Sequence, residues 1–152
     1  MFEIEGTKNP DEILIKTATK NILINVAEAQ VSADLNVGVL SGPGEYEVGE
    51  ATIRGIGVGA NKAQTIYDVE VSGVHVGIIA GIEDGLDDLG PADILCTSSV
   101  RAVREISPQL VIAMGNVDGM VTELKLTART EKKLKVKNVD ALPAAMEVVV
   151  LN

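Results

Sequence analysis

Histidine, cysteine and aromatic side chains are scarce in this sequence of 152 residues. It holds one histidine, one cysteine and no tryptophan, and its aromatic content is 2%. His75 cannot build a histidine-rich zinc site alone, because such a site needs several converging ligands, so we interpret it as a partly exposed strand residue. Cys96 cannot form an internal disulfide, and its apolar flanks indicate a buried, inert thiol rather than a nucleophile.

Basic charge and long apolar runs are also lacking. Thirteen Lys and Arg residues stand against 22 Asp and Glu residues, and the net charge of −9 would repel a phosphate backbone, which excludes nucleic acid as a partner. The longest apolar stretches, such as Val76–Ile82, are far shorter than the ~20 residues of a membrane-spanning helix, so we also exclude a membrane. The single cysteine and the lack of a charged-then-apolar leader predict a cytoplasmic protein.

Aliphatic residues are abundant instead. Hydrophobic residues make up 46% of the sequence and the mean hydropathy is +0.24, which excludes disorder and favours strands buried on both faces. At this length we expect one domain, residues 1–152, with a core of Val, Ile, Leu and Ala side chains.

The clearest motif is a turn-rich segment at residues 41–56, which predicts a hairpin. Its first turn combines two glycines, which allow unusual backbone angles, with a proline that fixes one angle between them. Gly49-Glu50 supplies a second tight turn, so we expect Tyr46 and Val48 to pair with Thr52 or Ile53. None of its groups suggests catalysis, and we interpret it as a structural hairpin motif. The residues of this motif are Gly42, Pro43, Gly44, Glu45 and Tyr46.

Residues 42–48 resemble the Gly-Pro-Gly-Glu-Tyr-Glu-Val hairpin of small bacterial hydrolases of the metallo-β-lactamase fold, in the branch of the ascorbate-phosphate lactonase-like enzymes. Further matches to this branch follow in the same order along the chain. They are Thr65–Tyr67, Ala92–Leu95, Ser107–Met114, Leu134–Lys137 and Glu147–Leu151. The resemblance covers residues 37–152.

The resemblance implies the fold of this family without its chemistry. It implies an α+β protein, a reduced four-layer αββα sandwich of metallo-β-lactamase type, rich in strands and with few short helices. Such enzymes hold two zinc ions with a His-x-His-x-Asp-His motif and with ligands from later strand ends. Here Ala27–Asn36 replaces the motif region and contains no histidine, and the positions that match two further ligands are Gly81 and Gly115. We therefore predict no catalytic residues, no metal ligands and no cofactor.

Three other segments each admit a functional and a structural interpretation. The acidic cluster consists of Glu83, Asp84, Asp87 and Asp88. Its oxygens could bind Mg²⁺ or Ca²⁺, but the spacing does not match a calcium loop, and a solvated short helix with Leu86 and Leu89 inward explains it more simply. The glycine-spaced run Gly55–Lys62 lacks the helix that a phosphate loop requires, so we interpret it as a flexible connector. A basic run at residues 132–137 is either a docking patch or, as we favour, a solvated strand edge.

Alternation and turn residues predict the remaining elements. We expect strands near residues 12–16, 21–26, 65–71, 74–80, 93–97 and 110–114. A helix over Val100–Ile106, capped by Ser98 or Ser99, should join the last two as a β-α-β unit. Three more strands are expected near residues 121–126, 134–136 and 146–151, divided by the charged segment Ala128–Lys133 and by Leu142-Pro143.

The function that follows is a non-catalytic domain that acts as a binding or assembly module, with an unknown protein partner or a second copy of itself. Without a metal, water remains a poor nucleophile, and no Ser-His or Cys-His pair is available as a substitute. The alternative is a metal-dependent hydrolase of a lactone, ester or phosphoester that has rebuilt its site from Glu83, Asp84, Asp87 and Asp88, with or without His75.

Overall fold

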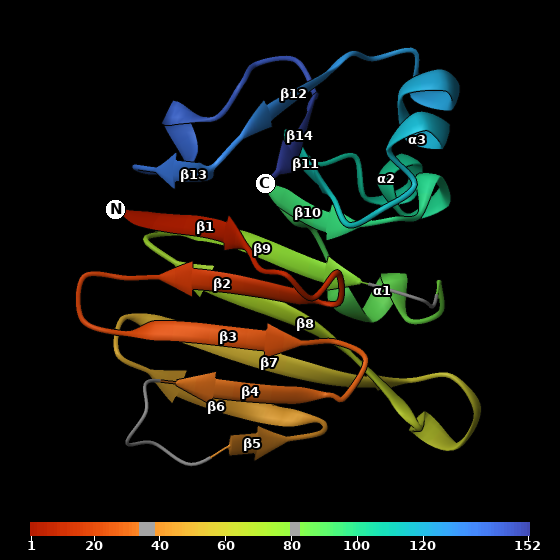
Figure 1. The fold of residues 1–152 in the computed structure, drawn as a ribbon. Coiled ribbons are helices and arrows are strands. Elements are labelled where there is room, and N and C mark those ends of the chain that lie inside the picture. The colour runs from red at the N-terminus through yellow and green to blue at the C-terminus, as the bar shows by residue number, and fades with distance from the viewer. Residues whose placement is uncertain (34–38, 80–82) are drawn as a thin grey trace.

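The computed structural model describes residues 1–33, 39–79 and 83–152, and in these ranges the strands form two sheets (Figure 1). The strands of the first sheet are β1 (Phe2–Gly6), β2 (Glu12–Lys16), β3 (Asn21–Asn25), β4 (Gln30–Ala33), β5 (Val39–Ser41) and β13 (Lys133–Val136). Those of the second are β6 (Gly44–Val48), β7 (Ala51–Val58), β8 (Gln64–Val71), β9 (Val74–Ile79), β10 (Ile94–Thr97), β11 (Leu110–Ala113), β12 (Ala128–Glu131) and β14 (Glu147–Leu151). The described helices are α1 (Leu86–Leu89), α2 (Val100–Ile106) and α3 (Val117–Leu124), with 3₁₀ turns η1 (Ala60–Lys62) and η2 (Val139–Ala141).

The first sheet is antiparallel, in the spatial order β13-β1-β2-β3-β4-β5. Its sequence alternates with the period of a sheet that buries one face: Ile13 and Ile15 of β2 are buried, whereas Leu14 and Lys16 are half-buried on the other face. The register then follows from matching the buried faces of neighbouring strands, as when Ile15 pairs with Ile22 of β3.

The second sheet is mixed, in the order β12-β14-β11-β10-β9-β8-β7-β6. Strands β6, β7, β8 and β9 pair with one another as antiparallel hairpins. From β9 onward the pairing is parallel, through β10, β11, β14 and β12. The predicted β-α-β unit is present as β10-α2-β11. The helix spans the predicted range, and the Ser99 side chain caps it by accepting a hydrogen bond from the Ala102 backbone N at 3.1 Å.

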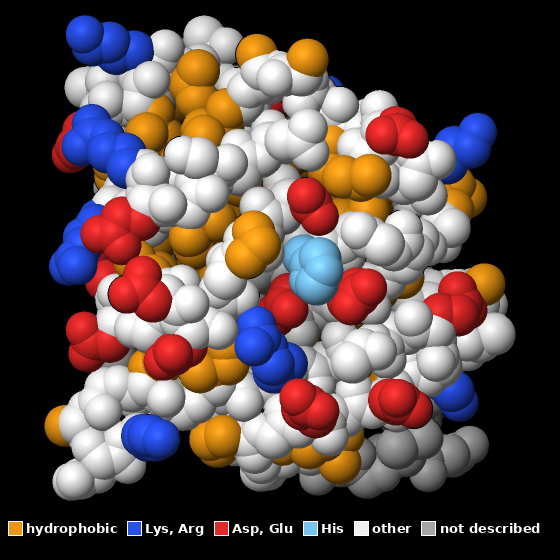
Figure 2. Space-filling view, turned by 180° about the vertical axis from the view of Figure 1, so that it is seen from behind, with side chains coloured by type: hydrophobic (Ala, Val, Ile, Leu, Met, Phe, Trp, Pro, Cys, Tyr) orange, Lys and Arg blue, Asp and Glu red, His pale blue; other side chains and the backbone are white. Residues whose placement is uncertain are grey.

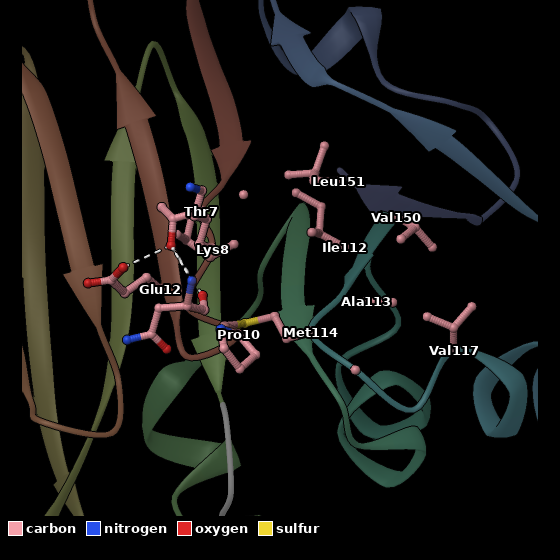
Figure 3. A pocket seen from close by; sticks show the side chains of 14 residues that line it. Thr7, Lys8, Pro10, Glu12, Ile112, Ala113, Met114, Val117, Val150 and Leu151 are labelled. Atoms are coloured by element: carbon pink, nitrogen blue, oxygen red, sulfur yellow. Dashed lines mark hydrogen bonds between the residues drawn. The ribbon is translucent and has the colours of Figure 1, made fainter.

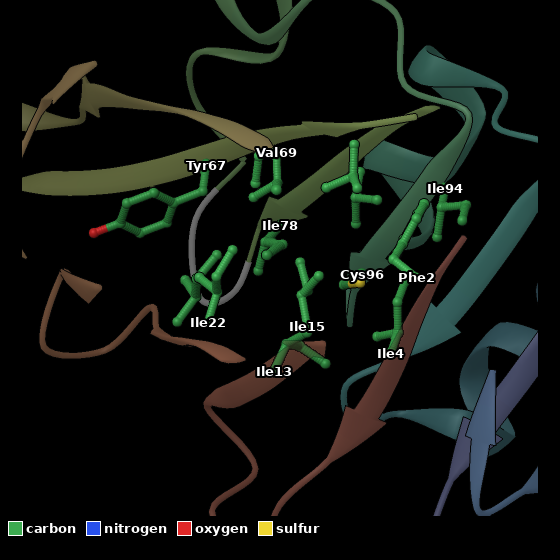
Figure 4. Close-up of a cluster of buried hydrophobic side chains, with 14 of the residues drawn as sticks. Phe2, Ile4, Ile13, Ile15, Ile22, Tyr67, Val69, Ile78, Ile94 and Cys96 are labelled. Carbon is green, nitrogen blue, oxygen red and sulfur yellow. The ribbon is translucent and has the colours of Figure 1, made fainter. Parts of the chain in front are cut away.

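A core of aliphatic side chains fills the space between the two sheets (Figure 4). Phe2 and Tyr67 are its large aromatic members, and both are buried. Burial of one Ile or Val side chain contributes about 1.5–3 kcal/mol to stability, so the facing isoleucines are a main source of cohesion. The isoleucines that are fully buried in this core are Ile4, Ile15, Ile22, Ile24, Ile53, Ile78 and Ile94.

Helices α1 to α3 pack on the outer face of the second sheet and enclose a second core. Leu89, Val103 and Met120 from the helices contact the sheet there. On the first sheet, by contrast, the outer residues such as Glu5 and Leu14 are half-buried, and no described α-helix contributes to the core on that side. The predicted α+β class is confirmed. Over the described residues the layers are the first sheet, the second sheet and the helices on the outer face of the second sheet.

The two outer edges near the chain ends are polar. Strand β13 is an edge strand with Lys133 and Lys135 exposed, as expected for the solvated strand edge, and Lys133 lies 3.4 Å from Glu3 of β1. The predicted charged divider at residues 128–133 is wrong in part, since it contains the edge strand β12, paired in parallel with β14. All four residues of β12 are exposed, so no alternation reveals the strand in the sequence.

The strand predicted near residues 121–126 is wrong, because α3 occupies Val117–Leu124. Met120 is buried in the second core, and Leu124, one turn later, packs against the same core. A separation of four residues is the spacing of one helix face. Contact with α2 supports this choice, since Arg104 donates a hydrogen bond to the Glu123 backbone O at 3.1 Å. The short apolar pattern is compatible with both structures, and packing selects the helix.

Gly85, just before α1, provides a test of the packing between this helix and the second sheet. Its φ is +79°, and a Cβ at this position would collide with Val58. We expect Gly85→Ala to lower the free energy of unfolding by about 2–5 kcal/mol, because left-handed strain adds to overpacking. Urea denaturation measures the change. Gly73→Ala is the matched control, since φ is +75° but nothing lies within 4 Å, and it should cost only about 1–2 kcal/mol. Equal losses in the two variants would contradict the packing argument.

Candidate functional site

A cleft of about 320 Å³ lies where the turn between β1 and β2 meets the ends of β11 and β14 (Figure 3). One wall comes from residues 6–10 with Glu12 and Ile13, and the other from residues 112–115 with neighbouring side chains of α3 and β14. The carboxyl ends of parallel strands are the usual place for ligands in sheets of this kind, so this cleft is the candidate site.

The polar groups of the cleft bond mainly to one another. The Thr7 hydroxyl donates to Glu12 Oε1 at 2.8 Å and accepts from the Asn9 backbone N at 3.0 Å. The opposite wall is apolar, and Met114 points across the cleft toward Pro10 in Figure 3. Among the described lining residues there is one carboxylate and one amine, and there is neither imidazole nor thiol. The cleft therefore has the lining of a small amphipathic pocket.

Gly115, one of the two positions that match family ligands, lies in this cleft with φ of +93° and open space around it. Gly81, the other position, lies outside the described residues. The ends of β10 and β11 are joined by protein hydrogen bonds: the Met114 backbone N donates to Thr97 O at 3.0 Å, and the Asn116 side chain donates to Ser98 O at 3.1 Å.

Comparison with known proteins identifies the fold. No model of a known protein family matches the sequence, and no curated protein matches it. A solved structure from Thermotoga maritima, that of a candidate Zn-dependent hydrolase of the metallo-β-lactamase superfamily, matches with a TM-score of 0.74 and 16% sequence identity, over 99% of this chain and 98% of that chain. This chain has the metallo-β-lactamase fold. A likeness at this identity concerns the fold and does not transfer an activity.

The metallo-β-lactamase fold implies a zinc site at its strand ends, and the donor groups described there do not fit one. Zinc sites in proteins use three or four converging nitrogen, sulfur or oxygen ligands. Residues 1–33, 39–79 and 83–152 contain no group of three or more His, Cys, Asp or Glu side chains placed to hold a metal ion. Cys96 is fully buried in β10, as predicted, and burial raises the pKa of its thiol far above the usual range, which disfavours the thiolate that would bind a metal.

The acidic cluster surrounds α1 at an exposed hollow of the surface. Its members Glu83, Asp84, Asp87 and Asp88 line this hollow together with Arg101 and Glu105 of α2. Arg101 donates to Glu105 at 3.0 Å, and this bond, with the nearby cluster carboxylates, raises the pKa of the guanidinium. Leu86 and Leu89 are buried as predicted. The positive charge beside this acidic cluster is therefore the Arg101 guanidinium.

The hairpin motif at Gly42–Tyr46 is held by contacts among its own residues. Tyr46 pairs with Ile53 as predicted, whereas Val48 pairs with Ala51 and not with Thr52 or Ile53. The Tyr46 hydroxyl lies 3.0 Å from Gly42 O and 3.1 Å from Ser41 O, so it ties the turn to its own strand. The ring lies so close to Gly44 that a Cβ there would be 3.2 Å from its Cζ atom. The turn therefore needs this glycine.

The glycine run Gly55–Lys62 is not a connector, because its first residues belong to β7. A Cβ at Gly55 would lie 3.0 Å from Gly42 O, and one at Gly57 would lie 3.1 Å from Pro43 Cγ. These glycines allow the hairpin turn to approach the backbone of β7 closely. This close approach is the physical reason for the glycine spacing.

A cluster of ionisable side chains that the sequence analysis did not bring together lies on the outer face of β7, β8 and β9. Asp68 is 8% exposed, and its carboxylate oxygens both lie 3.2 Å from Nδ1 of His75 and one lies 3.7 Å from the guanidinium of Arg54. Glu70 lies beyond His75, with Oε2 3.9 Å from Nε2. Figure 2 shows the histidine at the surface between acidic side chains. Burial raises the pKa of the Asp68 carboxyl, and the hydrogen bond to His75 opposes this shift.

The sequence does contain a signal for this cluster. The hairpin registers place Arg54 opposite Asp68 and Glu70 opposite His75. Both pairs stand on the polar face of strands whose other face is apolar. Reading the registers together with the alternation would have assembled the cluster, whereas the strands taken singly leave His75 isolated.

The two tyrosines give a matched test of the hydrogen bonds that the Tyr46 hydroxyl donates to the hairpin turn. Tyr46→Phe removes a hydroxyl that bonds the turn, and we expect a loss of about 0.5–1.5 kcal/mol in the free energy of unfolding. The buried Tyr67 hydroxyl has no partner among the described residues, and burial raises the pKa of Tyr67 to about 12. Tyr67→Phe should therefore leave stability unchanged or increase it. A larger loss in Tyr67→Phe than in Tyr46→Phe, measured by urea denaturation, would contradict both assignments.

The pH dependence of stability tests the environment of Asp68. Its folded pKa lies above the ordinary value of 3.8, so the folded protein binds more protons than the unfolded chain just above pH 3.8, and the stability linked to this group is lost as pH rises. Asn does not titrate. Relative to Asp68→Asn, the wild type should therefore lose free energy of unfolding as the pH rises above about 4. Urea denaturation at each pH measures the difference, and a relative gain would show that attraction to His75 and Arg54 outweighs burial.

Proposed function

We propose that this protein is a non-catalytic domain of the metallo-β-lactamase fold that acts as a binding or assembly module. The observation that carries the proposal is the lining of the candidate cleft. The strand end at Met114-Gly115 offers a thioether and a bare backbone where the related hydrolases are expected to place a metal-binding imidazole. A thioether is a weak ligand for zinc, and glycine has no side chain to offer.

Hydrolysis by this fold depends on a metal that lowers the pKa of bound water. A chain with a single imidazole must find that metal's ligands among carboxylates, and its densest carboxylate cluster contains Arg101 as a cation. A metal-independent route would need an activated nucleophile beside a base. Cys96 is enclosed in the core, so the one thiol cannot reach a substrate.

Binding is the function that this arrangement supports. We infer one cytoplasmic domain that offers its surface to an unidentified protein partner or to a second copy of itself. The described part of the chain contains no helix that is long and apolar enough to cross a membrane. Sedimentation velocity over a range of concentrations distinguishes the two partners, since a concentration-dependent increase in mass identifies self-association.

Metal content and turnover test the proposal directly. After purification and gel filtration we expect no metal in stoichiometric amount, and no hydrolysis of lactone, ester or phosphodiester substrates above the buffer rate with added Zn²⁺, Mn²⁺ or Mg²⁺. Elemental analysis and substrate assays measure these quantities. A retained metal together with hydrolysis that Asp87→Ala abolishes would overturn the proposal in favour of a rebuilt hydrolase. Asp140→Ala, an exposed carboxylate outside the cluster, is the control for that variant.

A further inference from the structure

The His75 imidazole is oriented by the Asp68 carboxylate, and Asp93 fixes the backbone that carries it. Its backbone N donates to Asp93 Oδ2 at 2.8 Å, and its carbonyl accepts from the Asp93 backbone N at 2.9 Å, so the strand position is fixed. Its Nδ1 lies 3.2 Å from both carboxylate oxygens of Asp68, which is buried. A carboxylate can only accept a hydrogen bond when ionised, so the proton of the neutral imidazole belongs on Nδ1. The lone pair is then on Nε2.

Nε2 faces a second carboxylate at a distance that a metal ion can bridge. Glu70 stands directly opposite His75 in the antiparallel pair of β8 and β9, and its Oε2 lies 3.9 Å from Nε2. This separation is too long for a hydrogen bond. Two ligands of one tetrahedral zinc ion, with bonds of about 2.0–2.2 Å, stand about 3.4 Å apart, so a small side-chain rotation satisfies both. The Glu70 side chain is 50% exposed and free to make it.

The surrounding charge favours a cation. Asp68 and Glu70 together outweigh Arg54, whose guanidinium donates to the Leu89 backbone O at 2.8 Å and lies beside Asp68. The histidine side chain is 39% exposed, so an ion reaches Nε2 from solvent. A ligating histidine usually donates its other ring N–H to a carboxylate, which raises the basicity of the ligating nitrogen. Asp68 occupies that supporting position here.

We propose that His75 Nε2 and the Glu70 carboxylate form a surface site for a divalent transition ion, with zinc as its representative, and that water completes the coordination. An imidazole with a carboxylate selects ions such as zinc, nickel or copper over Mg²⁺ and Ca²⁺, which prefer oxygen ligands alone. The site lies on the outer face of the second sheet and not at the strand ends of the candidate cleft. With two protein ligands, it exchanges its ion with solvent.

The presence of one histidine makes the test direct. In a long-range ¹H–¹⁵N spectrum of the labelled protein, the single imidazole should carry its proton on Nδ1, and added zinc should shift or broaden the Nε2 signal in a saturable manner. His75→Gln should abolish binding, and Glu70→Gln, which removes one of the two protein ligands, should weaken it by at least the roughly 10–100-fold expected on loss of a supporting group. Asp68→Asn, which leaves both ligands in place, should weaken it roughly 10–100-fold as a positioning change.

Glu45→Gln is the matched control, because Glu45 is exposed and stands opposite Arg54, so it removes the same charge nearby without removing a ligand. It should leave zinc affinity unchanged. Zinc binding that survives His75→Gln, an imidazole protonated on Nε2, or no response to zinc would each overturn the site. These outcomes are independent of the hydrolase assays, since the proposed function fails through turnover and this site fails through the imidazole signal.

Discussion

The packing of two sheets face to face is the constraint on which the rest of this structure depends. Each sheet has to bury one apolar face, and neither face is covered without the other. With few aromatic residues, the chain fills the interior mainly with Ile and Val, whose branched side chains suit a pleated surface. Residues such as Ile53 and Val69 hold the sandwich together, and they lie inside their strands rather than at the strand ends where the fold family carries its chemistry.

This separation makes the cohesion of the sandwich independent of the groups at the strand ends. The strand ends are secured by protein hydrogen bonds, such as that from the Met114 backbone N to Thr97 O, and by packing of Met114 against the inter-sheet core. Gly115 lies in open space, and a side chain there contributes nothing to the core. At Gly115, therefore, the packing of the core does not depend on a side chain that could act as a ligand.

Much of the fold can be predicted from the sequence, because most strands here alternate or form apolar runs bounded by turn residues. The β2, β8 and β9 strands, the helix at Val100–Ile106 and the hairpin register at Tyr46 follow from local pattern and turn chemistry. The misses have a common cause. Strands β1, β4 and β5 were not assigned, β12 has four exposed residues, and α3 has an apolar spacing that suits both a helix and a strand. Such segments acquire their structure from the neighbours that they contact.

The candidate site, like the fold, can be predicted from the sequence only in part. The sequence by itself determined the scarcity of imidazole, the acidic charge and the turn chemistry of Gly42–Tyr46, because these depend on residue type and on local backbone preference. Only the tertiary structure decided that Arg54, Asp68 and His75 meet on one face, and that the turn before β2 closes a cleft with Gly115. The two walls of the cleft are far apart along the chain, and sheet packing brings them together. The ionisable cluster instead depends on the registers of two adjacent hairpins.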